Sequence, residues 1–178
     1  MALASLPSPL EYWDMYDRDG NALGRTITRG ERFQEGEYHL VVQVWLRRVD
    51  NSYLIQQRVD NGLWATTAGC VIAGETRQQG ALREIAEELG IRAAAYAFHV
   101  RYQDASACAL GTAWELNWEH TNQHIHIQFS EVQAYMWANP TQIRQMVAEG
   151  RFYNYGDSYF RHVFSTESDS IKEAGALC

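Results

Sequence analysis

The chain has few cysteines, and none of them lies in a CxxC motif. Cys70, Cys108 and Cys178 are the three cysteines among 178 residues, and they are far apart in the sequence. An odd and scattered set of this kind is typical of a protein kept in a reducing compartment. We therefore expect free thiols rather than a disulfide framework.

The chain also lacks a long apolar run. Its hydrophobic stretches are far shorter than the roughly 20 residues that a membrane-spanning helix needs. Glu11 and Asp14 stand where a signal peptide would be apolar. These absences predict a soluble, cytoplasmic protein with no membrane partner.

The chain also has fewer positively charged than negatively charged residues. There are 15 lysines and arginines against 22 aspartates and glutamates, which gives a net charge of −7. This balance argues against a long nucleic acid as partner, although a nucleotide stays possible if a metal supplies positive charge locally. With 46% hydrophobic residues, the chain can bury one substantial core. We expect a single domain over residues 1–164, with an N-terminal hairpin at about 11–28, and a poorly ordered polar tail over 165–178.

The most informative segment contains a short helix with two different faces. Thr76 followed by Gln79 fits a capping box, and Gly90 stands where a left-handed residue ends a helix, so the helix is predicted over about 76–89. At about 100° per residue, the apolar and acidic side chains separate. The predicted apolar stripe is Leu82, Ile85, Ala86 and Leu89, and the acidic stripe is Glu84, Glu87 and Glu88.

The acidic stripe is an unfavourable arrangement for a helix on its own. Glu84 and Glu88 form a like-charge pair four residues apart, and Glu87 and Glu88 lie in the last turn, where the helix dipole disfavours negative charge. A merely solvated face is the simpler interpretation. A cluster of hard carboxylate oxygens also suits Mg²⁺ or Mn²⁺, which is the interpretation that we favour.

The segment from Gly69 to Ile91 resembles the signature of the Nudix hydrolases, Gly-x5-Glu-x7-Arg-Glu-U-x-Glu-Glu-x-Gly-U with U aliphatic, at every fixed position. The resemblance implies an α/β fold, with an α/β/α sandwich around a mixed sheet, and Mg²⁺-dependent hydrolysis of a small-molecule diphosphate. It also allows a homodimer, which is common in the family. The matching positions are Gly69, Glu75, Arg83, Glu84, Ile85, Glu87, Glu88, Gly90 and Ile91.

The resemblance assigns roles within this segment. Glu84, Glu87 and Glu88 take the metal-ligand positions, helped by a backbone carbonyl near Ala68 or Gly69. Glu87 and Arg83 count among the catalytic candidates, and Arg83 pairs with Glu75 to fix the loop on the helix. Gly80 lies on the acidic side, where a small residue leaves space for the loop.

The general base often comes from a later strand or loop in this family. Glu131, six residues before Trp137 and ahead of a predicted helix, is our candidate. An exposed turn glutamate is an equally good interpretation of Glu131, and Glu115 and Glu119 are substitutes.

Most of the first 91 residues resemble the branch of Nudix proteins related to isopentenyl diphosphate isomerase. The quoted features are Asp17, Gly20 and Gly24 in the early hairpin, His39, Leu54 to Arg58, and Gly62 to Trp64. Two positions argue against isomerase activity: Ala68 stands where the isomerase has a catalytic cysteine, and Cys70 where it has a metal-binding histidine. The alternatives to a hydrolase are an isomerase and a non-catalytic nucleotide-binding domain. Cys70 is expected to be a small packing residue.

Outside the signature, the candidates for substrate binding are weaker. Arg58 could bind phosphate bidentately and Trp64 could stack on a flat group, although a surface arginine and a core tryptophan are common. His39 could line a cleft or lie in the core. For His120, His124 and His126, a surface or pocket-lining role is favoured over zinc binding.

The remaining elements can be placed coarsely. Two hairpins are predicted, the first from Glu11 to Asp17 and Ala22 to Thr28, the second from Leu40 to Arg47 and Tyr53 to Gln57. Further predictions are strands over Ala94 to Tyr102 and His124 to Phe129, the latter with Ile125, Ile127 and Phe129 on one face, and a helix over about Thr141 to Glu149.

Overall fold

The structure is a computed structural model that describes residues 10–94, 98–106, 108–120 and 124–165. The predicted polar tail, apart from Ser165, and Cys178 lie outside the described residues. No helix in the described part of the chain is both long and apolar enough to cross a membrane.

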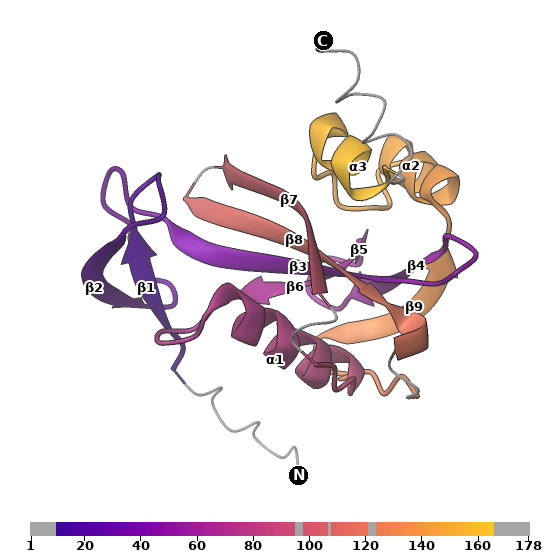
Figure 1. Ribbon diagram of the computed structural model, residues 1–178, viewed down its shortest axis with the longest axis horizontal. Coiled ribbons are helices and arrows are strands. Elements are labelled where there is room, and N and C mark those ends of the chain that lie inside the picture. Colours follow the sequence, from indigo (N-terminus) through magenta and orange to yellow (C-terminus); the bar gives the residue numbers. More distant parts are fainter. Residues whose placement is uncertain (1–9, 95–97, 107, 121–123, 166–178) are drawn as a thin grey trace.

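The sheet is mixed, and β3 (His39–Arg47) is its central strand (Figure 1). β3 runs parallel to β8 (Ala109–Asn117) over its whole length and antiparallel to β6 (Thr67–Cys70). The predicted mixed α/β fold is therefore confirmed. The other strands of this sheet are β4 (Tyr53–Arg58), β5 (Trp64–Ala65), β7 (Phe98–Ser106) and β9 (Val132–Ala138).

β3 and β4 pair with each other next to their turn and with different strands beyond it. β3 and β4 pair at Arg47 and Tyr53, next to their turn. Beyond that point β3 pairs with β6, whereas β4 pairs with β9 and β5. β4 and β6 are instead linked by side chains, since Oγ1 of Thr67 donates to Oε1 of Gln56 (3.2 Å).

Helices cover both faces of the sheet (Figure 1). α1 (Arg77–Leu89) packs on one face, and α2 (Pro140–Ala148) and α3 (Asp157–Val163) pack on the other. Alternate residues of β3 pack against the helices on opposite sides of the sheet, because successive side chains of a strand point to opposite faces. Val44 belongs to the core under α1, and Trp45 to the core under α2 and α3.

The N-terminal hairpin forms a separate two-stranded sheet, as predicted. β1 (Tyr12–Tyr16) pairs antiparallel with β2 (Ala22–Thr28). A small apolar cluster of Trp13, Met15 and Ile27 joins the hairpin to the rest of the molecule, with Cys70 packed against it.

α1 begins and ends as the sequence predicts. Thr76 and Gln79 form the capping box, and Gly90 adopts a left-handed φ of 68°. The predicted apolar stripe needs one correction, because Ala86 is exposed and Ala81 is fully buried. The chain before α1 covers the side of the helix that contains Gly80 and Ala81. A Cβ on Gly80 would lie 3.0 Å from Cγ2 of Val71, so the buried face of the helix is turned toward that chain segment.

The strand predicted over His124 to Phe129 is wrong. This segment has no strand partner, and its backbone instead caps α1: His126 N donates to Leu89 O (2.8 Å) and Gln128 N donates to Glu88 O (3.0 Å). Such carbonyls lack partners at the end of a helix. Ile125 and Ile127 pack against the core, but Phe129 is 79% exposed.

Smaller differences concern boundaries and one missed helix. β7 starts at Phe98 and extends to Ser106, later than the predicted Ala94 to Tyr102, of which 95–97 lie outside the described residues. α2 matches its prediction within one residue at each end, because Asn139 caps it and Pro140 fits the first turn. α3 was not predicted.

Candidate active site

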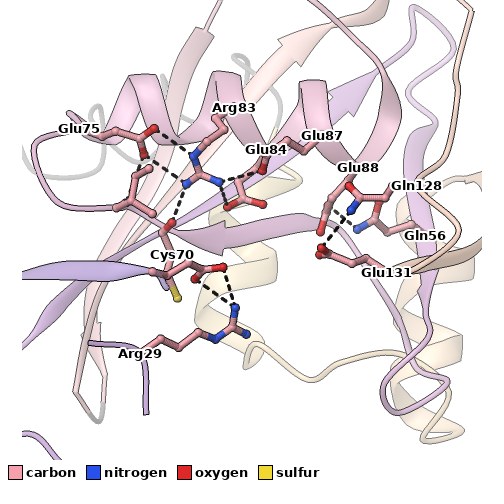
Figure 2. A network of polar contacts seen from close by, with 12 residues as sticks. Arg29, Gln56, Cys70, Glu75, Arg83, Glu84, Glu87, Glu88, Gln128 and Glu131 are labelled. Atoms are coloured by element: carbon pink, nitrogen blue, oxygen red, sulfur yellow. Dashed lines mark hydrogen bonds and ion pairs between the residues drawn. The ribbon is translucent and has the colours of Figure 1, made fainter. Parts of the chain in front are cut away.

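Arg83, in the middle of α1, makes polar contacts both within the helix and with the chain before it (Figure 2). Its Nε donates to Glu75 Oε1 (3.0 Å), and its Nη2 donates to the carbonyl of Cys70 (2.8 Å). Its Nη1 donates to Glu84 Oε1 (2.7 Å) and to Glu87 Oε2 (3.0 Å). One planar guanidinium can make all of these contacts because its donors form a fixed fork. The predicted pairing of Arg83 with Glu75 is present.

The three carboxylates of α1 differ in exposure. Glu84 and Glu88 are buried, with 8% and 4% of their surface exposed, whereas the Glu87 side chain is 54% exposed. β6 approaches Glu84 closely at Gly69, where a Cβ would lie 2.0 Å from Cδ of Glu84. Glycine is therefore required at position 69 for Glu84 to occupy this place.

The negative charges of the two buried carboxylates, Glu84 and Glu88, are only partly balanced by their neighbours. Glu88 Oε2 accepts a hydrogen bond from Nε2 of Gln56 (2.7 Å). Burial nevertheless raises the pKa of Glu88 to about 8, and the negative charges of Glu84 and Glu131 add to this rise. Burial also raises the pKa of Glu84, although the guanidinium of Arg83 opposes the effect.

A cavity of about 750 Å³ extends from these carboxylates. This cavity is lined by residues from both helical layers. We call the α1 residues Arg83, Glu84, Glu87 and Glu88 the acidic wall. We call Tyr153, Asn154, Tyr155 and Tyr159, which belong to α3 and the segment before it, the aromatic wall.

Glu131 lies on the cavity, as a general base must (Figure 2). Its backbone is fixed on both sides, since its N donates to Gln128 O and its O accepts from Val59 N, each at 2.9 Å. The two substitutes lie elsewhere. Glu115 is buried beside Arg47 (3.4 Å), and Glu119 accepts a hydrogen bond from Val49 N.

Of the three predicted substrate-binding residues, Arg58 is the one that lines the cavity. It is held by Asp60, with Nη2 2.8 Å from Oδ2. His39 packs between Trp13 and Phe33, with ring centroids at 4.6 and 5.3 Å. The structure therefore does not bring His39 to the cavity.

Trp64 anchors the aromatic wall rather than lining the cavity. Its N donates to Arg151 O (2.9 Å), and its O accepts from Tyr153 N (2.8 Å). These bonds align the segment before α3 with β5. The role of Trp64 in the described geometry is to hold Tyr153 in place.

The predicted histidine group is spread along the chain. His126 packs on Gly90 at the end of α1, with its Cβ 3.0 Å from the place of a glycine Cβ. His124 is exposed in the extended segment, and His120 ends a short 3-10 helix (Trp118–His120).

Several cavity residues were missed from the sequence. Arg29 reaches the cavity from the N-terminal hairpin and pairs with Glu11, with Nη1 3.0 Å from Oε1 (Figure 2). Tyr153 and Tyr155 come from a segment with no recognisable motif. A basic residue at a hairpin end and a tyrosine-rich segment are common in loops, so no local signal distinguished them.

Cys70 lines the cavity but has the properties of a packing residue. It contacts the apolar cluster under the N-terminal hairpin, and burial raises the pKa of its thiol to about 11. A thiol of this kind is a poor nucleophile near neutral pH, because the thiolate is the reactive form.

The donor set of the acidic wall fits a hard divalent cation. The groups are carboxylates, two of them buried with raised pKa values, and a cation would supply the missing positive charge. As the described side chains stand, no three acidic, histidine or cysteine groups converge as a complete ligand set. Glu84 faces Arg83 and Glu88 faces Gln56, so metal binding would replace these hydrogen bonds.

Comparisons with known proteins agree with this geometry. The family model described as the NUDIX domain matches residues 37–160. A stretch of 88 residues, 46% of this chain, is 40% identical to a Nudix hydrolase of Listeria monocytogenes and spans 52%, about half, of that relative. A 152-residue alignment, 26% identical, covers 82% of this chain and 90% of a Nudix hydrolase of Listeria innocua.

Solved structures show the same fold. A protein of Deinococcus radiodurans superposes with a TM-score of 0.72 at 18% identity, over 85% of this chain and 99% of that one. The family model covers well over half of the chain, and the signature segment lies within it. The chain belongs to the Nudix hydrolase family.

Proposed function

We propose that this chain is a Mg²⁺-dependent pyrophosphohydrolase that cleaves a diphosphate linkage in a nucleoside diphosphate derivative or a related compound. The observation that carries this proposal is the pair of buried carboxylates, Glu84 and Glu88, at one end of a cavity that also contains arginines. A divalent cation would complement the carboxylates, and a diphosphate would complement the arginines.

Glu84, Glu87 and Glu88 would hold the cation, which is Mg²⁺ or, as a chemical alternative, Mn²⁺. When bound, the cation neutralises diphosphate oxygens and lowers the pKa of a nearby water. Arg83 positions the ligands, because its guanidinium contacts both Glu84 and Glu87 and ties them to the loop at Glu75.

Glu131 acts as the general base. Its carboxylate takes a proton from the attacking water as the water oxygen bonds to phosphorus. The bridging P–O bond breaks, and its electron pair leaves with the departing phosphate group. The fixed backbone of Glu131 holds the carboxylate at the cavity during this step.

Arg58 and Arg29 bind the outer phosphate oxygens. Each is paired with an acid, Asp60 and Glu11 respectively, in contacts that solvent reaches. Exposed ion pairs of this type contribute only about 0 to 1 kcal/mol. A phosphate can therefore replace the carboxylate partner at little cost and accept a bidentate guanidinium contact.

The experiment is a screen of nucleoside and non-nucleoside diphosphates with Mg²⁺, comparing wild type with Glu84→Gln and Glu88→Gln. Loss of a metal ligand is expected to lower turnover by about 100-fold or more, because the nucleophile and the charge neutralisation are lost together. Glu35→Gln, an exposed site away from the cavity, is the matched control and should keep full activity. Equal activity in the glutamine variants and wild type contradicts the metal assignment.

The same screen separates the alternatives. Isopentenyl diphosphate is included, and formation of the dimethylallyl isomer would support the isomerase. Binding of nucleotides without release of phosphate or monophosphate from any compound would support a non-catalytic domain. Glu131→Gln tests the base, and a loss below about tenfold would place it elsewhere.

A further inference from the structure

The N-terminal hairpin contacts the loop between β6 and α1. Two residues of β1 accept hydrogen bonds from that loop: Ala73 N donates to Tyr12 O (2.7 Å), and Gly74 N donates to Oδ2 of Asp14 (2.8 Å). The family model begins at residue 37, after the end of β2. These contacts to the signature segment therefore come from a part of the chain that the family model does not include.

Ala73 and Gly74 are the two central residues of a tight turn. Glu75 N donates to Ile72 O (3.0 Å), which closes the turn, and Gly74 has a left-handed φ of 83°. The amides of the two central residues of such a turn have no acceptor within it, so they need acceptors from elsewhere. β1 supplies an acceptor for each of them.

Asp14 is itself fixed from the neighbouring strand. Its Oδ1 accepts a hydrogen bond from Oγ1 of Thr26 (2.8 Å), which lies opposite Asp14 in β2. Each oxygen of the carboxylate therefore has a partner, and Oδ2 is oriented toward the loop. A carboxylate held in this way loses little further freedom when it binds the Gly74 amide.

The turn leads directly to the contacts of Arg83. Oε2 of Glu75 accepts a hydrogen bond from Ile72 N (3.2 Å), which folds the Glu75 side chain back over the turn. The two oxygens of the same carboxylate accept from Nε and Nη2 of Arg83, and Arg83 contacts the glutamates of the acidic wall. A contiguous set of contacts thus runs from the hairpin through the turn to the proposed metal ligands.

We propose that Asp14 is a positioning residue of the metal site. Through the Gly74 amide it fixes the turn, and through the turn it fixes the Glu75 carboxylate against Arg83. This inference rests on the proposed function for the presence of a divalent cation at the acidic wall. The hairpin is then a clamp on the signature segment.

Other contacts keep the hairpin in place when Asp14 is changed. Tyr16 and Tyr38 exchange two backbone hydrogen bonds, of 2.8 and 2.9 Å. The apolar cluster of Trp13, Met15 and Ile27 is buried beneath the hairpin. Loss of the Asp14 carboxylate should therefore free the turn without unfolding the protein.

The experiment measures Mn²⁺ binding to the free protein by electron paramagnetic resonance, so it does not depend on hydrolysis. Asp14→Ala should raise the Kd of Mn²⁺ about 5- to 10-fold, somewhat less than loss of a direct partner of a metal ligand. Asp14→Asn should stay within about twofold, since its amide oxygen still accepts from Gly74 and its amide nitrogen can donate to Thr26. An unchanged Kd in Asp14→Ala, or an equal loss in Asp14→Asn, would overturn the proposal.

Asp17→Ala is the matched control in the same hairpin. Oδ1 of Asp17 accepts hydrogen bonds from Asp19 N and Asn21 N (2.9 Å each), and among the described residues its side-chain contacts stay within the hairpin turn. Asp17→Ala should lower the urea midpoint but leave the Kd of Mn²⁺ unchanged. An equal loss of Mn²⁺ affinity in Asp17→Ala and Asp14→Ala would assign the effect to hairpin stability and overturn the positioning role.

Ala73→Pro breaks the clamp from the loop side and leaves the hairpin sequence intact. Proline suits the second position of a turn but has no N–H to donate to Tyr12 O. It should raise the Kd of Mn²⁺ about 3- to 10-fold. An unchanged Kd would show that the hairpin contact does not reach the metal site.

Amide hydrogen exchange reports on the clamp itself. The Gly74 amide should exchange about tenfold faster in Asp14→Ala than in wild type or Asp17→Ala, because it loses its acceptor. Equal exchange rates in the three proteins would contradict the clamp.

These measurements also separate the inference from the proposed function. Faster exchange and weaker Mn²⁺ binding in Asp14→Ala, with no hydrolysis of any diphosphate by wild type, would overturn the hydrolase proposal and keep the positioning role. Hydrolysis that requires Glu84 and Glu88 but is unaffected by Asp14→Ala and Ala73→Pro would do the reverse.

Discussion

The acidic wall and the aromatic wall are built in different ways. The acidic wall comes from one short segment, in which Arg83 contacts neighbours one and four residues along the same helix. The aromatic wall comes from α3 and the segment before it, and that segment pairs with Trp64. The proposed metal site is thus encoded locally, whereas the opposite side of the cavity depends on residues that only the fold brings together.

The two walls also differ in what holds them. Close packing and charge hold the acidic wall, as the tight approach of Gly69 to Glu84 illustrates. Backbone hydrogen bonds and ring stacking hold the aromatic wall, and Tyr153 stays half exposed. Changes in the first should therefore affect turnover, and changes in the second should affect substrate binding.

The largest effect is expected from Gly69→Ala. The added methyl would overlap the carboxyl of Glu84, which must move away from its place in the acidic wall. We expect kcat/KM to fall by about 100-fold, as when the support of a metal ligand is lost. Gly80→Ala is the control, because its methyl would come no closer than 3.0 Å to Cγ2 of Val71 and 3.5 Å to Oε2 of Glu75, and the change should cost less than tenfold. Similar losses in both variants would show that general loop disruption is responsible.

Arg83→Lys should come next. Lysine keeps the charge but cannot contact Glu75, Glu84 and the Cys70 carbonyl together, because it lacks the planar fork. We expect kcat to fall by about 10- to 100-fold. A double-mutant cycle with Glu75→Gln measures the coupling; strictly additive losses would contradict the supporting role of the pair.

Arg58→Gln should have a smaller effect of a different kind. Loss of a charged hydrogen bond to phosphate is expected to raise KM about tenfold with little change in kcat. Arg161→Gln, at an exposed position of α3, removes the same charge away from the cavity. A fall in kcat with unchanged KM would place Arg58 in the chemical step.

His39→Phe should change the stability of the protein and leave its activity within twofold of wild type. Burial against Trp13 and Phe33 lowers the pKa of His39 from its ordinary value of 6.5. Below pH 6.5 the unfolded chain binds a proton that the native state does not, so stability falls as pH decreases. Urea midpoints at pH 7.5 and 5.5 should show a smaller pH dependence in His39→Phe than in wild type. A large change in KM would instead return His39 to the binding site.

The sequence was most informative where structure depends on nearby residues. The limits of α1 follow from Thr76, Gln79 and Gly90, whose caps are local contacts, and the fit of the signature segment led directly to Arg83 and Glu75. The strand predicted over His124 to Phe129 was wrong, because alternating apolar and polar residues suit both a strand and an extended segment that caps a helix. The sequence analysis placed Trp64 and His39 from residue type and from the resemblance to the isomerase-related branch, and neither determines what surrounds them.

The sequence by itself determined the family, the helix and the set of carboxylates, since spacing along one helix fixes which side chains share a side. The tertiary structure decided that Glu84 and Glu88 are buried while Glu87 is exposed, because β6 and β4 cover only one flank of α1. It also decided which residues face these carboxylates across the cavity. The strand order β3-β8-β7 and the bond between Tyr153 and Trp64 bring Asp104, Gln43 and Tyr153 to one cavity, and no local pattern records these long-range pairings.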